Sequence, residues 1–141
     1  MKLSTCFILV VFASFSFVAC KKSAADYANE ANPAPEGDNI SLGNFMRSSH
    51  DTRGTARVVT DTISGKKYLV FENFRTDNGP DLRVWMSRST SASQSREVGK
   101  LTAVSGNFSY ELTPDIDPLV FNHVLIWCED FSVLFGYAIL R

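Results

Sequence analysis

Cysteine is scarce in this chain, which contains only Cys6, Cys20 and Cys128. The first two lie in or at the end of an apolar N-terminal segment, so Cys128 is the only cysteine in the region expected to fold. A disulfide within that region is therefore excluded, and its stability must come from a packed core. A chain of 141 residues is long enough for one domain with such a core.

Most catalytic signatures are also missing. There is no GxSxG, HExxH, phosphate-loop, GxGxxG or CxxC motif, and no basic block or face. With a net charge of −1, the sequence predicts no nucleic-acid partner. The carboxylate pairs Asp115/Asp117 and Glu129/Asp130 lie in turn-like segments and are interpreted as solvated turn residues. A stand-alone enzyme is therefore not the favoured interpretation.

The first nineteen residues are interpreted as an export signal. Lys2 supplies a positive start, and the apolar run from Phe7 to Val18 is too short to span a bilayer. The ending Phe17-Val18-Ala19-Cys20 resembles the cleavage box of bacterial lipoproteins, in which the cysteine becomes the lipidated first residue. We therefore expect residues 1–19 to be removed and Cys20 to anchor the protein to a membrane of the bacterial cell envelope, facing the periplasm or the cell surface.

Two further regions follow the signal. Residues 20–39 are small, polar and proline-containing, a composition typical of a disordered tether. From residue 40 to residue 141 the composition is that of a folded domain, rich in β-branched and aromatic residues. The predicted organisation is therefore a signal, a lipidated tether and one domain.

No apolar period of 3.6 residues persists in the domain, which argues against helices. Short apolar runs separated by turn signals instead predict strands over residues 42–46, 55–60, 67–74, 82–86, 98–104, 107–112, 120–128 and 131–140. The segment Asn78-Gly79-Pro80-Asp81 is a concentrated turn signal before the fourth of these. The predicted class is all-β, an antiparallel β-sandwich or closed barrel of about eight short strands.

The last two predicted strands form a hairpin around Glu129 and Asp130. Both faces of each strand carry large apolar side chains, so we expect both faces to be covered and the hairpin to lie deep in the domain. Cys128 ends the first strand, where Trp127 points to the opposite face. An inert, buried cysteine is one interpretation. The other is that Cys128 is a ligand to haem or to a soft metal, or a shielded thiol.

Two histidines are the remaining candidates for a site. His50, in a polar loop, is interpreted either as a solvated residue or as part of a cofactor site with Cys128. His123, on an apolar strand, is most simply a partly buried, hydrogen-bonded residue. Copper held by both histidines, Cys128 and a methionine such as Met46 or Met86 has the right ligand types. The order of these ligands along the chain differs from that of cupredoxins, because no histidine or methionine follows Cys128.

The order of motifs resembles that of the DM-thirteen domain family, named for electron transfer. The resemblance rests on Gly43-x-Phe45 with His50 and Gly54, and on the runs NFRTDNGPDLRVWMS, GKLTAVSGNFSYEL and VLIWCEDFSVLFGYAIL. In bacteria this family occurs as small envelope proteins and lipoproteins. It implies a β-rich domain whose characteristic cysteine, here Cys128, works as a redox thiol or as a ligand to a prosthetic group. No second redox module is fused, so a separate redox partner is implied.

The leading hypothesis is therefore a lipid-anchored envelope protein with an electron-transfer domain centred on Cys128. The alternative is a non-catalytic module that binds a ligand or a protein, with Asn78 to Asp81 and the His50 loop as its surface and Cys128 as core packing.

Overall fold

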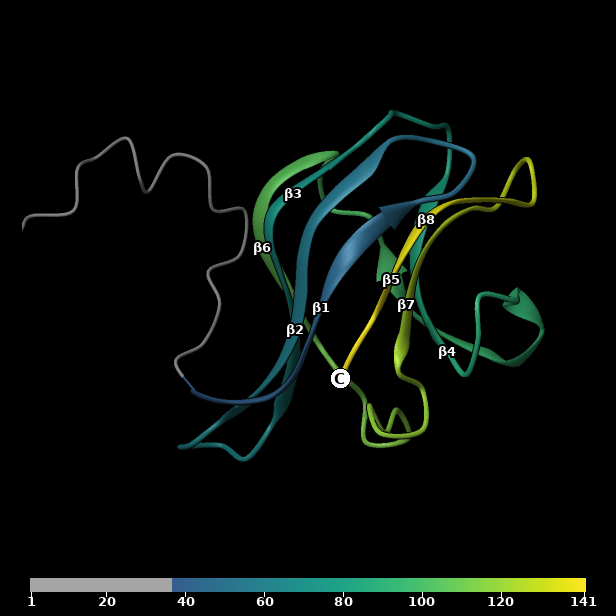
Figure 1. The fold of residues 1–141 in the computed structure, drawn as a ribbon. Coiled ribbons are helices and arrows are strands. Elements are labelled where there is room, and N and C mark those ends of the chain that lie inside the picture. Colours follow the sequence, from purple (N-terminus) through teal and green to yellow (C-terminus); the bar gives the residue numbers. More distant parts are fainter. Residues whose placement is uncertain (1–36) are drawn as a thin grey trace, which may run out of the picture.

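Eight strands account for the fold, and the computed structural model describes residues 37–141 (Figure 1). The strands are β1 (Gly37–Arg47), β2 (Thr52–Asp61), β3 (Lys67–Thr76), β4 (Leu82–Ser87), β5 (Ser95–Lys100), β6 (Ser105–Glu111), β7 (His123–Cys128) and β8 (Val133–Ile139). A single 3₁₀ turn, η1 (Ala92–Gln94), interrupts them within the described region. All strand pairs are antiparallel. The prediction of an all-β, antiparallel fold of about eight strands is confirmed.

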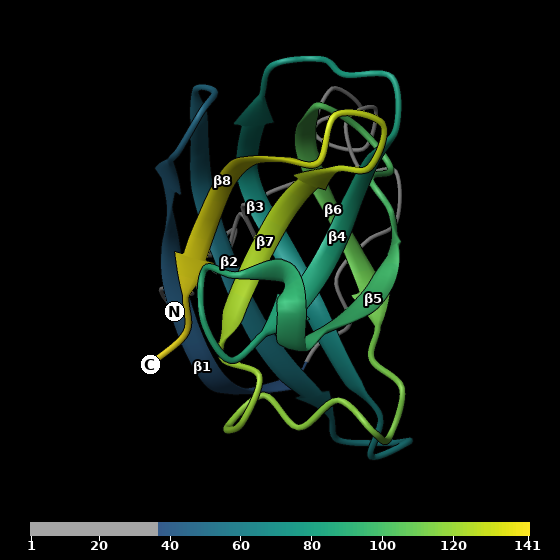
Figure 2. The same cartoon turned by 90° about the vertical axis from the view of Figure 1, so that its right-hand side faces the viewer.

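All eight strands belong to one sheet, in the order β5-β4-β7-β8-β1-β2-β3-β6. The sheet curls into a half-barrel, with its edge strands β5 and β6 approaching each other without forming a ladder (Figures 1 and 2). Tyr110 of β6 spans this seam. Its hydroxyl donates to the carbonyl of Lys100 over 3.2 Å and accepts from the amide of Thr102 over 2.9 Å. The architecture is therefore closer to a barrel than to two stacked sheets.

Because neighbouring strands alternate in direction, the connections divide between two ends of the half-barrel. Segments 48–51, 77–81, 101–104 and 129–132 gather at one end, which we name the motif end (top of Figure 2). Segments 62–66, 88–94 and 112–122 turn back toward the other end, where β1 also begins. We name this second end the tether end.

The core lies inside the curl and is strongly aromatic. Phe71, on β3, is fully buried and packs its ring 4.9 Å from Phe45, 5.0 Å from Phe74 and 5.2 Å from Phe108. These four rings come from β1, β3 and β6, so they join the strands on one side of the half-barrel. The Phe45–Phe71 pair is edge-to-face and the other two are tilted. Edge-to-face pairs contribute roughly 0.5–1.5 kcal/mol each beyond their buried area.

The terminal hairpin is central in the sheet, as predicted. β7 is fully buried on its inner face, where Val124, Ile126 and Cys128 join the core, and on its outer face Leu125 is fully buried between the partly buried His123 and Trp127. On that outer face the rings of Trp85 and Trp127 stack with centroids 5.3 Å apart. Large neighbouring side chains thus supply the outer cover that the sequence led us to expect from another part of the fold.

Several strand boundaries differ from the prediction, among them those of β5, β7 and β8. β5 spans Ser95–Lys100 in place of 98–104, because residues 101–104 leave the ladder to cross the seam at the motif end. Phe131 is 67% exposed at the tip of the last hairpin, where Ser132 adopts a positive φ of 52°. β7 begins at His123, so residues 120–122 belong to the preceding connection.

The folded domain also begins earlier than the predicted residue 40. β1 begins at Gly37, and Gly37, Asp38 and Asn39 pair with β2. These residues had been assigned to the tether on composition alone. The predicted signal, Cys20 and the rest of the tether lie outside the described residues. Within residues 37–141 the chain forms no helix capable of spanning a bilayer.

Candidate functional site

The motif end brings together the residues that the sequence singled out. Cys128 is the last residue of β7, Asn78 to Asp81 precede β4, and His50 lies between β1 and β2. These segments are far apart in the chain, yet their connections all lie at the same end (Figure 2). In the observed strand order β1, β3 and β7 run in the same direction, so the segments that follow them lie at the same end.

Cys128 is fully buried in the apolar core. In the ladders it faces Leu82 of β4 on one side and Val133 of β8 on the other. It is the only cysteine among residues 37–141, and its thiol is free. Its sulfur is therefore protected from solvent and reagents as long as the motif end stays closed.

The turn at Asn78 to Asp81 covers the strand ends next to Cys128. The side-chain oxygen of Asn78 accepts a hydrogen bond from the amide of Gly79 over 3.0 Å. A Cβ atom at Gly79 would lie 2.9 Å from Cδ2 of Leu82 and 3.0 Å from Cζ of Phe135. A larger residue here would have to displace these two side chains, and Leu82 in turn faces Cys128.

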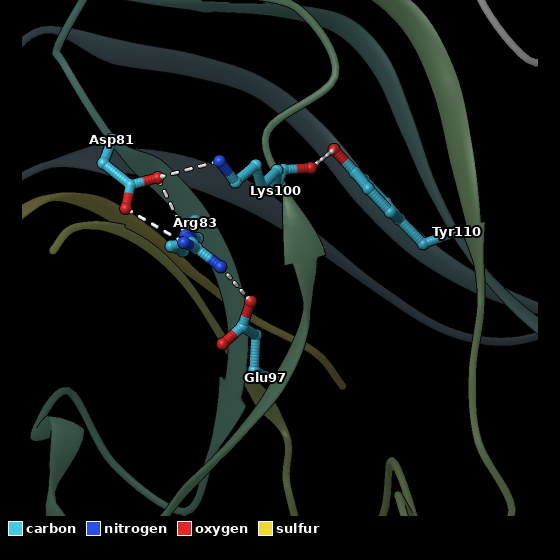
Figure 3. Close-up of polar contacts among 5 residues, drawn as sticks. All are labelled: Asp81, Arg83, Glu97, Lys100 and Tyr110. Atoms are coloured by element: carbon cyan, nitrogen blue, oxygen red, sulfur yellow. Dashed lines mark hydrogen bonds and ion pairs between the residues drawn. The ribbon is translucent and has the colours of Figure 1, made fainter.

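Asp81 fastens this turn to the sheet (Figure 3). Its carboxylate accepts two hydrogen bonds from Arg83, at 2.8 and 2.9 Å, and lies 3.9 Å from Nζ of Lys100. Arg83 also donates to Glu97 of β5 over 2.6 Å. The backbone carbonyl of Asp81 accepts from the amide of Glu129, just after Cys128, over 2.9 Å. The turn is thus tied to both β5 and the β7–β8 hairpin.

The Asp81–Arg83 pair is expected to make the stability of the domain depend on pH in the acid range. The hydrogen bonds from Arg83 lower the pKa of Asp81 below its usual value of 3.8. A lowered folded-state pKa gives a contribution to stability that is present above pH 3.8 and is lost as pH falls through the folded-state value. Asp81→Asn should therefore lower the melting temperature at neutral pH and flatten the acid limb of the stability profile. Asp130→Asn, in the exposed β7–β8 turn, is the control; an equal effect there would refute the special role of Asp81.

His50 lies on the same apolar support as the turn. Its Nδ1 donates to Oδ2 of Asp77 over 3.1 Å, and its ring stacks on Phe135 with centroids 3.8 Å apart. The amide of His50 also donates to the carbonyl of Phe135 over 3.1 Å. His50 is therefore a positioned, half-exposed residue that joins two connections at the motif end.

These residues do not fit a metal or a haem. Among residues 37–141, no three His, Cys, Asp or Glu side chains converge as a metal-binding group. A cavity of about 270 Å³ lies beneath the turn, lined by Asn78–Leu82 and by residues 100–104, and Cys128 does not line it. Cys128 is sealed among apolar neighbours, so no open coordination position faces its sulfur.

His123 lies at the opposite end of β7 from Cys128. Its Nδ1 and Oδ1 of Asn122 are 2.8 Å apart and share a hydrogen bond, and partial burial lowers the pKa of His123. The interpretation of His123 as a partly buried, hydrogen-bonded histidine is confirmed.

Sequence reasoning missed Arg83, Glu97 and Phe135 as parts of the motif end. Arg83 follows Asp81 by two residues, and alternation along an extended segment places such residues on one face, so this pair was detectable. Glu97 and Phe135 carry no such signal, because their positions depend on the pairing of β4 with β5 and on the bulges in the sheet.

The fold and the motif end together define a small all-β domain that shields one cysteine beneath a hydrogen-bonded turn. The chain belongs to the Electron transfer DM13 family, whose model matches residues 44–140. The match includes His50, the turn from Asn78 to Asp81, and Cys128. No curated protein and no solved structure matches the chain. The resemblance to the DM-thirteen family is thus confirmed, and the domain is a module related to electron transfer.

Proposed function

We propose that this chain is a lipid-anchored electron-transfer protein of the bacterial cell envelope, and that Cys128 is its redox centre. One observation carries the proposal: the turn from Asn78 to Asp81 and the Trp127-Cys128 segment, far apart in the chain, meet at the motif end around a single free thiol. Membership of the electron-transfer family supports the same assignment.

The chemistry available to a lone thiol is exchange with a disulfide. No second cysteine lies in residues 37–141, so the disulfide must belong to a separate redox partner or a small molecule. Cys128 loses its proton to solvent, and its thiolate attacks one sulfur of that disulfide. The old S–S bond breaks, a mixed disulfide forms, and the second sulfur leaves as a thiolate. In formal terms the sulfur of Cys128 is thereby oxidised by one electron, and the leaving sulfur is reduced by one.

Because Cys128 is buried, the exchange requires its thiol to become accessible to the partner disulfide. The segments that can open over it are the motif-end connections, which lie outside the strand ladders. Local opening of this kind costs less than global unfolding. The motif end would then control access to the thiol.

The anchor is proposed from the N-terminal sequence. Lipid on Cys20 would hold the domain at the membrane through residues 21–36. A tethered domain meets partners in the same membrane at high effective concentration.

The test is exchange of the native domain with oxidised glutathione. We expect the mass of the protein to increase by one glutathione under native conditions, and the adduct to be released by a reducing thiol. The expected rate is slow, because it is limited by opening of the motif end. Reaction that occurs only after denaturation would contradict the proposal.

The complete burial of Cys128 favours a second function, a binding module in which the cysteine is core packing. The half-exposed His50, the cavity beneath the turn and the charged Asp81–Arg83–Glu97 group would then form the recognition surface. This function predicts no native-state exchange at Cys128, so the same experiment separates the two.

A further inference from the structure

The tether end projects two large apolar side chains into solvent. Ile63, between β2 and β3, is 96% exposed, and Leu119, between β6 and β7, is 78% exposed. Both connections lie along the bottom of the half-barrel in the two views (Figures 1 and 2). Single exposed apolar residues are common on protein surfaces, whereas two large ones at the same end of a domain form a candidate contact surface.

The turns that carry Ile63 and Leu119 also share their local hydrogen-bond geometry. Oδ1 of Asp61 accepts a hydrogen bond from the amide of Ile63 over 2.8 Å, and Oδ1 of Asp117 accepts one from the amide of Leu119 over 3.1 Å. In each case an aspartate two residues earlier folds back onto the turn. The carboxylate is occupied by the backbone, and the apolar side chain is left at the tip. Two unrelated connections thus present the same kind of apolar tip at the same end.

Positive charge lies beside one of these tips. The guanidinium carbons of Arg88 and Arg96 are 5.4 and 5.2 Å from the ring centroid of Phe121, two residues after Leu119. Among residues 37–141, Arg88 makes no ion pair, and Arg96 makes only a 3.7 Å contact with Asp115. Two guanidinium groups drawn to one ring repel each other, so an anion placed near them would be stabilised.

The chain enters the domain at this same end. β1 begins at Gly37 and runs away from the tether end, so residues 21–36 connect the proposed lipid on Cys20 to the side of the domain that carries Ile63 and Leu119. The motif end, with Cys128 and His50, lies at the opposite end. The tether therefore joins the domain at the end that carries the two apolar tips.

We propose that the tether end rests on the lipid bilayer, with Ile63 and Leu119 entering the interfacial layer and Arg88 and Arg96 facing lipid phosphates. The occupant of this surface is thus a phospholipid membrane, and the motif end is turned outward to soluble or membrane-bound redox partners. This orientation rests on the proposed anchor at Cys20, but the affinity of the domain for lipid does not.

The first experiment measures that affinity without the anchor. The chain beginning at residue 20 and carrying Cys20→Ser is sedimented with vesicles of equal parts phosphatidylethanolamine and phosphatidylglycerol. Ile63→Ser and Leu119→Ser should each weaken binding about tenfold, because each removes a large apolar side chain from the interface. Phe131→Ser, at an exposed apolar tip of the motif end, should leave binding unchanged.

The second experiment measures orientation on the anchored protein. Tryptophan is introduced as Leu119→Trp or Phe131→Trp, in the same background of Trp85 and Trp127. Brominated acyl chains should quench the added fluorescence at position 119 and not at position 131. Arg88→Gln and Arg96→Gln should weaken binding to vesicles with phosphatidylglycerol and leave weak binding to phosphatidylcholine unchanged.

The outcomes separate the two proposals. Absence of acyl mass on Cys20 would refute the anchor while the Cys20→Ser measurements still report on the surface. No vesicle binding by the Cys20→Ser chain, equal binding by all three serine variants, or quenching at position 131 in place of 119 would each overturn the membrane-facing tether end. A protein partner at this surface would give the first of these results.

Discussion

Leu82→Ala is expected to make Cys128 react with a disulfide reagent about thirtyfold faster in the native protein. Leu82 is nearly fully buried and faces Cys128 in the β4–β7 ladder, directly beneath Gly79 of the turn. Deleting its side chain leaves a cavity and costs roughly 2–5 kcal/mol at a buried site. If about 2 kcal/mol of that cost lowers the free energy of local opening, the open state becomes about thirtyfold more populated, and Cys128 reacts about thirtyfold faster. The rate constant is read from thiol release in excess reagent.

The matched control is Leu69→Ala. Leu69 is also fully buried in the core, but it lies on β3, in the other half of the sheet. At equal loss of global stability, Leu69→Ala should accelerate the reaction much less than Leu82→Ala, because it does not loosen the motif end. Equal acceleration would show that Cys128 reacts only through global unfolding, and the binding-module function would then be favoured.

Cys128→Ser should lower the free energy of unfolding by about 2 kcal/mol and abolish all thiol exchange. The serine hydroxyl would be buried among apolar side chains without a hydrogen-bond partner, which costs roughly 1–3 kcal/mol. Cys128→Ala should cost less, about 1 kcal/mol, because it leaves a small apolar gap and no buried polar group. Urea unfolding of the three proteins measures both values. Serine tolerated better than alanine would mean that the sulfur faces a polar or hydrated space.

The fold class could be predicted because its signals are local. Turn signals such as Asn78-Gly79 and alternation around Tyr68 and Val70 fix the number and direction of short strands. Strand order could not be predicted, since β1 lies between β8 and β2 only through pairings that span the whole chain. Exposure of Phe131 was missed because its apolar side chain suggests a strand, whereas the positive φ of Ser132 places it in a turn.

The site was predictable in its parts and not in its geometry. Residue types and motif order pointed to Cys128, His50 and the turn from Asn78 to Asp81. Their meeting at one end follows from antiparallel topology, which the sequence does not reveal residue by residue. The complete burial of Cys128 and the stacking of His50 on Phe135 depend on side-chain packing and needed the structure. The hypothesis of a metal ligand at Cys128 finds no support in that packing.

The most direct test of Cys128 as a redox centre shielded by the motif end is the urea dependence of its native-state reaction with a disulfide. Local opening exposes little surface, so the rate should stay nearly constant at low urea concentration and rise only when global unfolding takes over. A rate that follows the full unfolding slope from the lowest urea concentration would contradict this account. Cys128 would then be a packing residue that reacts only in the unfolded chain.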